Sequence, residues 1–199
     1  GPIPPELGNL SALRELYLYQ NQLNGEFGFK SGDFCVFPRL LSPLSPLWLA
    51  GRIPPELGAL SERRVLALNN NKLTGHIPPQ LGQLGALQHL FLSGNKLDGT
   101  IPEALGKLTA LQELYLSNNK LSGEETENVV LDSSRFTRSV RPLAGPIPSE
   151  LGHLSALKGL YLTNNELSGA IPAQLGALNS VTWLDLSGNQ LSGERGVEI

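Results

Sequence analysis

The chain has 199 residues, of which 15 are Lys or Arg and 18 are Asp or Glu, and its net charge is −3 at pH 7. Because acidic and basic residues are interspersed, this balance argues against nucleic acid or an anionic membrane as the partner. The single cysteine, Cys35, excludes an intrachain disulfide, and no signal peptide or apolar run long enough to span a bilayer is present.

One 24-residue pattern, L-G-x-L-x-x-L-x-x-L-x-L-x-x-N-x-L-x-G-x-I-P-x-x, accounts for about three quarters of the chain. It is most complete at residues 105–123, LGKLTALQELYLSNNKLSG. A unit of this size cannot bury its own apolar face, so successive units must stack and share one continuous core. Copies of the pattern begin at Leu7, Leu57, Leu81, Leu105, Leu151 and Leu175.

Each fixed position of the pattern has a physical role. The Leu-x-Leu pair alternates with a period of two, which predicts a short strand whose two leucines point to the core. The Pro after Ile fixes φ and lacks an N–H donor, so that segment is expected to leave the strand. The Asn of each unit is expected to hydrogen-bond backbone groups of its own coil and of the next one. This predicted structural ladder comprises Asn21, Asn71, Asn95, Asn119, Asn165 and Asn189.

The repeat pattern, present as six copies in one register, resembles the plant-type leucine-rich repeats, whose hallmark is L-x-G-x-I-P. The resemblance implies an α/β repeat solenoid, a right-handed superhelix with a parallel β-sheet on its concave side and irregular or 3₁₀ segments on its convex side. Family members of this type are receptor ectodomains, receptor-like proteins and secreted inhibitors that bind proteins, peptides or small ligands. The resemblance implies a receptor-like ectodomain at the cell surface or outside the cell. The chain begins inside a repeat tail, at Gly1-Pro2-Ile3-Pro4, so we expect a fragment.

In chain order, the first copy is followed by a non-repeat insertion at 26–51, and three copies then follow without a gap. A second insertion occupies 124–145, two more copies follow it, and residues 194–199 form a non-repeat tail. Removing both insertions restores the pattern without a missing residue, because 52–123 and 146–193 are whole multiples of 24. The domain is therefore expected to cover residues 1–199 as six interrupted repeats.

Two interpretations of the insertions stay open. Each begins with Glu after a Gly and ends with Leu-Ala-Gly, and these residues can be encoded by splice-donor and splice-acceptor sequences, so the segments can be translated introns. The alternative is a pair of genuine loop insertions, for which the entropic cost of length is small. Structureless loops of this length are uncommon in compact domains, which favours the intron hypothesis.

Arg63 stands where the other copies have Leu or Val. Because burying an unpaired charge is costly, we expect its side chain to reach out to solvent.

No catalytic or metal-binding constellation is predicted. His76, His89 and His153 fall at three different positions of the repeat, a pattern typical of scattered surface histidines. The segment Gly106-Lys107-Leu108-Thr109 lacks the first glycine of a phosphate loop, and the repeat explains it better. We therefore predict no enzyme activity, no metal and no cofactor.

The strand residues that point away from the core are the candidate ligand-binding residues. They should form columns across the concave face, in which aromatic side chains from successive units are neighbours, and such side chains dominate protein-binding hot spots. Glu113 and His89 beside them can orient a polar or basic partner. The alternative is that aromatic residues merely suit a strand surface. The candidates are Tyr17, Phe91, Tyr115, Tyr161, Trp183, His89 and Glu113.

The favoured function is a recognition module that binds a protein or peptide, as part of a receptor or defence-type protein. Two alternatives stay open: the repeat segment of a larger multidomain enzyme, such as a receptor kinase or a Roc-COR GTPase, and a secreted inhibitor of an enzyme. No nucleic acid and no membrane contact by this segment is expected.

Overall fold

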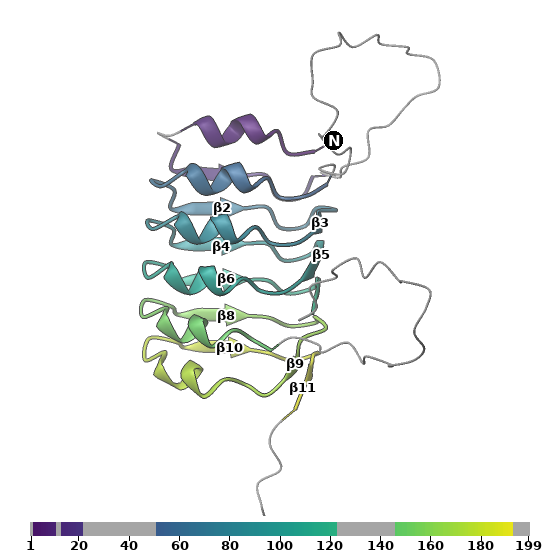
Figure 1. The fold of residues 1–199 in the computed structure, drawn as a ribbon, viewed down its shortest axis with the longest axis vertical. Helices are drawn as coiled ribbons and strands as arrows, with labels where there is room; N and C mark the ends of the chain where they lie inside the picture. The colour runs from purple at the N-terminus through teal and green to yellow at the C-terminus, as the bar shows by residue number, and fades with distance from the viewer. Residues whose placement is uncertain (1, 11–12, 22–50, 123–145, 193–199) are drawn as a thin grey trace, which may run out of the picture.

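The computed structural model describes residues 2–10, 13–21, 51–122 and 146–192 of the chain. The described residues form a stack of coils, each with a strand on one side and a short 3₁₀ helix on the other (Figure 1). The predicted solenoid, with a parallel sheet on one side and 3₁₀ segments on the other, is confirmed. The first insertion up to residue 50, the whole second insertion and the tail after 192 lie outside the described residues.

The main sheet contains one strand from each coil, and each strand coincides with a Leu-x-Leu pair. The strands are parallel and are ordered β1-β2-β4-β6-β8-β10. The strands β1 and β2, and likewise β6 and β8, pair across the positions of the two insertions in the same register as uninterrupted neighbours. Their bounds are β1 (Glu15–Tyr17), β2 (Val65–Ala67), β4 (His89–Phe91), β6 (Glu113–Tyr115), β8 (Gly159–Tyr161) and β10 (Trp183–Asp185).

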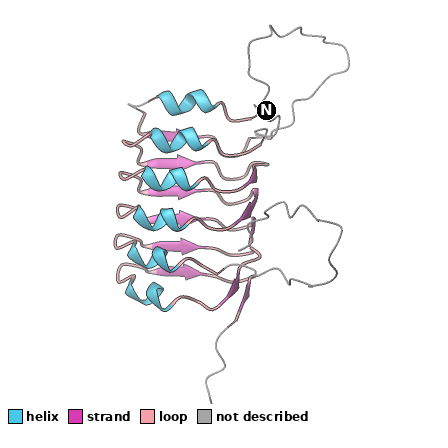
Figure 2. Cartoon of the chain, in the orientation of Figure 1, coloured by secondary structure: helices cyan, strands magenta, loops and turns pink. Residues whose placement is uncertain are grey.

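The 3₁₀ helices lie on the side opposite the main sheet (Figure 2). Each follows a Pro in extended conformation, such as Pro78 with ψ of 128°, because Pro fixes φ and ends the preceding extended segment. A Cβ on Gly8 would lie only 2.5 Å from the carbonyl oxygen of Glu56 in the adjoining coil, so this position requires glycine for close stacking. The helices are η1 (Pro5–Asn9), η2 (Pro55–Ala59), η3 (Pro79–Gln83), η4 (Glu103–Lys107), η5 (Ser149–His153) and η6 (Ala173–Ala177).

Further short strands form the lateral edge of the coils. One small sheet has the order β3-β5-β7 and another pairs β9 with β11, all parallel. The strands β3, β5 and β9 each end two residues before the Ile of an Ile-Pro pair, whose Pro has no N–H to continue the ladder. Their bounds are β3 (Thr74–Gly75), β5 (Lys96–Gly99), β7 (Lys120–Leu121), β9 (Ser168–Gly169) and β11 (Gln190–Leu191).

The core lies between the main sheet and the 3₁₀ helices, and leucines at equivalent positions of the inner coils have no exposed surface. The expectation for Arg63 is wrong. Its side chain is fully buried, and none of its three guanidinium nitrogens has a hydrogen-bond partner among the described residues. Burial lowers the pKa of the Arg63 guanidinium. Arg63 therefore occupies the buried position that Leu or Val holds in the other copies, and burying its charge lowers the stability of the fold.

Candidate functional site

The outer face of the main sheet, called the sheet face below, carries the residues predicted for ligand binding. Strand register fixes its columns, because paired residues of parallel strands point to the same side. The central column is continuous across all six strands of the main sheet. Its members are Tyr17, Ala67, Phe91, Tyr115, Tyr161 and Asp185.

Four aromatic side chains of the sheet face form one uninterrupted series of ring contacts, called the aromatic stripe below. Phe91 meets Tyr115 edge to face with ring centroids 5.0 Å apart. The ring of Tyr115 is stacked on that of Tyr161 at 4.0 Å with an interplanar angle of 19°, and Tyr161 is followed by Trp183 at 6.4 Å and 25°. Such pairs add about 0.5–1.5 kcal/mol each beyond their buried area, so the stripe is pre-organised.

Gly159 makes this stacking possible. A Cβ at Gly159 would lie 2.7 Å from a ring carbon of Tyr161, which shows that the ring lies directly over the glycine. Gly159 pairs with Trp183 in the next strand, so the Tyr161 ring fills the space between Glu113 and Trp183 in the neighbouring column. No role was predicted for Gly159. The alignment of the repeats does show it as the one glycine in a column of larger residues.

Tyr17 does not join the aromatic stripe. The residue between it and Phe91 in the central column is Ala67, which is buried and has no ring. Tyr17 instead contacts Tyr19 edge to face at 6.3 Å and donates a hydrogen bond to Glu15 at 3.1 Å. The predicted binding residues therefore fall into a contiguous group and one separate member.

The predicted polar residues lie at the edge of the aromatic stripe. Nδ1 of His89 is 3.1 Å from Oε2 of Glu113, and the His89 ring stacks on Phe91 with centroids 5.9 Å apart. Burial raises the pKa of Tyr115, with further contributions from the Tyr161 hydroxyl and the Glu113 carboxylate. The Tyr115 hydroxyl therefore remains protonated at neutral pH and can donate a hydrogen bond.

Asp185 is a member of the sheet face that the candidate set omitted. Its Oδ1 accepts hydrogen bonds from the Ser187 backbone N–H at 3.1 Å and from the Ser187 hydroxyl at 2.7 Å. These bonds, together with one from the Thr163 hydroxyl, lower the pKa of the Asp185 carboxyl. The signal was present in the sequence as a carboxylate two residues after Trp183, on the same face of the strand.

The asparagine ladder holds successive coils together at one end of the main sheet. Nδ2 of Asn119 donates to Leu116 of its own coil at 2.9 Å and to Leu92 of the preceding coil at 3.1 Å, while its Oδ1 accepts from the Leu97 N–H at 3.1 Å. The expectation of bonds to the next coil is wrong, because the second coil bonded by Asn119 is the preceding one. Asn21 has only own-coil acceptors for its Nδ2 among the described residues, Leu18 and Tyr19.

Outside the sheet face, the described residues contain no group of three or more His, Cys, Asp or Glu placed to hold a metal ion. His76 lies 3.9 Å from Asp98 on the lateral edge, and His153 is exposed in η5. No helix within the described ranges is long and apolar enough to cross a membrane.

The family described as "Leucine rich repeat" matches residues 62–121 and 148–191, which is about half of the chain. The chain therefore belongs to the leucine-rich-repeat family. No curated protein sequence matches it at a significant level.

Solved structures of plant receptors are similar to the whole described stack. One is the ectodomain of the membrane receptor kinase GASSHO1/SCHENGEN3 from Arabidopsis thaliana, in complex with CASPARIAN STRIP INTEGRITY FACTOR 2. It is 36% identical with a TM-score of 0.71, over 96% of this chain and 17% of that chain. Another is the plant peptide hormone receptor RGFR1 in complex with RGF2, at 31% identity and a TM-score of 0.71, over 96% and 23%. This chain thus spans less than a quarter of either receptor chain.

The match to a shorter relative covers similar shares of both chains. The ectodomain of BIR2 from Arabidopsis thaliana is 33% identical with a TM-score of 0.55, over 73% of this chain and 65% of that chain. The predicted resemblance to plant-type leucine-rich repeats of receptor ectodomains is confirmed by these matches.

Proposed function

We propose that the chain is a segment of a plant receptor-type ectodomain whose sheet face binds a protein or peptide. The observation that carries the proposal is the aromatic stripe, in which Phe91, Tyr115, Tyr161 and Trp183 make continuous ring contacts on a rigid sheet. Rigid aromatic side chains provide a large contact area with little loss of conformational entropy on binding. The similar receptors GASSHO1/SCHENGEN3 and RGFR1 were solved with a bound factor or peptide, which supports the same role.

The proposal assigns recognition, and no catalytic step, to this segment. Support comes from a receptor ectodomain and a peptide hormone receptor, each solved in complex with its factor or peptide. The main-sheet residues that face solvent are joined by stacking and local hydrogen bonds, an arrangement suited to holding a partner in place.

A test uses peptides selected from a randomised display library on the purified chain. Tyr115→Ala and Tyr161→Ala are each expected to weaken binding of the selected peptides by about 1–2 kcal/mol, because each removes a ring from the centre of the stripe. Tyr17→Ala is the matched control, since Tyr17 lies outside the stripe, and it should leave affinity nearly unchanged. Affinity is measured by calorimetry and folding by circular dichroism. Unchanged affinity in both stripe variants would place the binding site elsewhere.

We further propose that the domain consists of six 24-residue units and that the segments 26–51 and 124–145 are translated introns. The register supports this, because Leu16 pairs with Leu66, and Leu114 with Leu160, as directly as residues of adjoining units do. Sequencing the mature transcript tests it. A transcript that retains the codons of both segments would identify them as loop insertions.

A further inference from the structure

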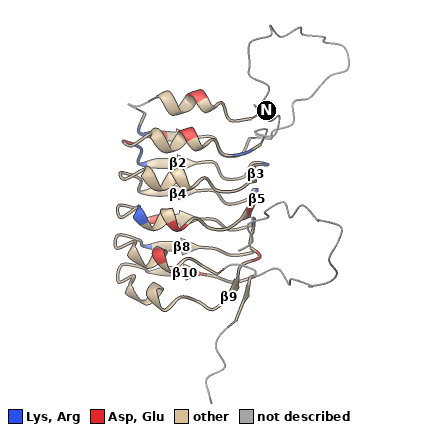
Figure 3. Ribbon diagram, viewed as in Figure 1, with Lys and Arg blue, Asp and Glu red and all other residues tan. Residues whose placement is uncertain are grey.

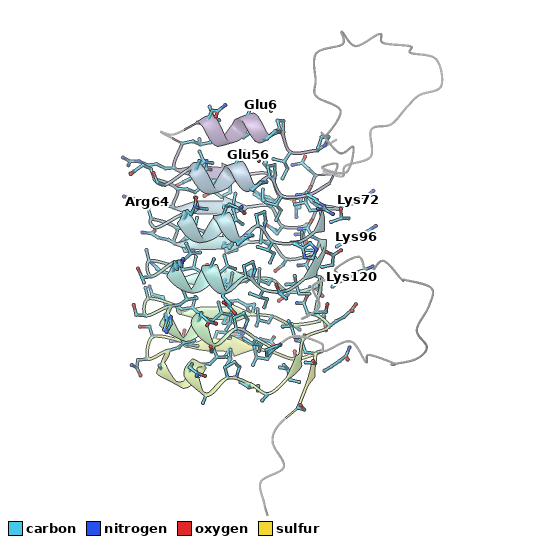
Figure 4. The ribbon with its side chains drawn as sticks, viewed as in Figure 1. Glu6, Glu56, Arg64, Lys72, Lys96 and Lys120 are labelled. Carbon is cyan, nitrogen blue, oxygen red and sulfur yellow. The ribbon has the colours of Figure 1, made fainter. Side chains whose placement is uncertain are left out.

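The charge of the sheet face differs from that of the edges. The three solvent-facing columns of the main sheet contain the carboxylates of Glu15, Glu113 and Asp185 but no Lys or Arg among the described residues. Basic residues, Arg14, Arg64 and Lys158, stand immediately before β1, β2 and β8. Residues of both signs lie on the 3₁₀ helices and along the edges of the coils (Figure 3). The exposed lysines Lys72, Lys96 and Lys120 project from the edge that carries β3, β5 and β7 (Figure 4).

Among the described residues, no ion pair joins the carboxylates at the two ends of the sheet face to a Lys or Arg. Glu113 is next to His89, but Glu15 accepts from the neutral Tyr17 hydroxyl. Asp185 is held by the neutral donors of Ser187, and no ion pair joins it to a Lys or Arg in the described part of the chain. Neutral donors fix the carboxylate and keep it ionised, but its negative charge stays available to a ligand.

The stacking of the rings determines where a cation can sit on the aromatic stripe. Tyr115 and Tyr161 are nearly parallel at 4.0 Å, so each covers a face of the other. A cation is attracted to a ring face and not to its electropositive edge. Trp183 is 59% exposed, whereas the other three rings of the stripe are only partly exposed, so its indole is the most accessible ring.

Trp183 and Asp185 are two residues apart on one strand and point to the same side of the sheet. A planar group lying on the indole is therefore within reach of the carboxylate. Of the protein side chains, the guanidinium of arginine is suited to both contacts, since it stacks on aromatic faces and donates parallel hydrogen bonds to a carboxylate. Lysine carries the same charge but lacks a planar group that can stack on the ring and donate two parallel hydrogen bonds.

We propose that the peptide partner carries an arginine that stacks on Trp183 and pairs with Asp185 at the β10 end of the aromatic stripe. This inference rests on the proposed function, and it adds the chemical class of the ligand and the end of the stripe at which its cation binds. The Asp185 carboxylate then attracts the arginine, and the stripe contacts apolar residues of the peptide.

The test starts from peptides selected on the chain from a randomised library, compared with the unselected library. Arginine should be enriched among peptides whose binding is lost in Tyr161→Ala. Replacing the anchoring arginine by citrulline, which keeps the shape and removes the charge, should weaken binding about tenfold. The same replacement should have an effect below about twofold in Asp185→Asn, because the charge pair is already gone. Asp98→Asn, which removes a carboxylate from the lateral edge, is the matched control and should leave the full citrulline effect.

The outcomes separate the two claims. Peptides that depend on Tyr161 but show no arginine enrichment, or an equal citrulline effect in Asp185→Asn and in the unmodified chain, would overturn the arginine site and leave the proposed function standing. Selected peptides that bind Tyr161→Ala and Tyr115→Ala as well as the unmodified chain would overturn the proposed function and the arginine site together. Trp183→Leu, checked for folding by circular dichroism, should reduce the affinity of arginine peptides about tenfold and that of citrulline peptides much less.

Discussion

The inner coils and the last described coil share one sequence pattern but bury it differently. Leu66, Leu90, Leu114 and Leu160 have no exposed surface, whereas Leu184 at the same position of the last coil is 49% exposed. Ile171 is 53% exposed, although its equivalents in the preceding coils are almost fully buried. This difference shows that the coils on both sides of a leucine bury it. The stability of the stack therefore depends on the contacts between neighbouring coils.

This difference is tested most directly by truncating the equivalent leucine in an inner coil and in the last described coil. Leu114→Ala removes a side chain packed on all sides and should lower the free energy of unfolding by about 3 kcal/mol. Leu184→Ala removes one already half in solvent and should cost less than about 1 kcal/mol. Urea unfolding followed by circular dichroism measures both. Equal losses would show that burial in the stack does not depend on the neighbouring coil.

A second substitution concerns the coil that departs from the pattern. Arg63→Leu restores the leucine found in other copies and removes a buried guanidinium without hydrogen bonds among the described residues. Because the pKa of Arg63 is lowered on folding, its protonated form opposes folding, so the variant should be more stable, by about 2 kcal/mol. Arg64→Leu, at an exposed position, is the control and should change stability by less than about 0.5 kcal/mol. A loss of stability in Arg63→Leu would mean that Arg63 is satisfied in the folded chain.

The asparagine ladder provides the smallest of these effects. Asn119→Ala removes hydrogen bonds to two coils and should destabilise the stack by about 1–2 kcal/mol. Asn21→Ala, whose side-chain amide donates only within its own coil among the described residues, should cost about half as much or less. Thermal unfolding of the two variants gives the comparison. A cost for Asn21→Ala that matches Asn119→Ala would show that bonding between coils adds nothing.

The repeat pattern predicted most of the fold, because its period determines which residues stack. The strands, the 3₁₀ side and the central column follow from aligning the copies. The error at Arg63 arose because the cost of burying a charge was weighed above the geometry imposed by the coils on either side, which hold position 63 inside the core. The direction of the asparagine bonds depends on how one coil is offset from the next, and the sequence does not contain that offset.

The candidate site was predictable in its members but not in its internal geometry. The columns place Phe91, Tyr115 and Tyr161 together, and Ala67 already separates Tyr17 from them in the same alignment. The orientation of the rings depends on the space above Gly159, which only the packed side chains reveal. Because Tyr115 and Tyr161 stack on each other, Trp183 is the most exposed ring of the stripe. We therefore expect a cation to bind at Trp183.

The central claim, that the sheet face is the recognition surface, is tested most directly by mapping a selected peptide on the chain by NMR. The amide signals of β4, β6, β8 and β10 are expected to shift on peptide addition, with those of the 3₁₀ helices unchanged. Shifts confined to the 3₁₀ helices, or to the edge formed by β3, β5 and β7, would contradict the account.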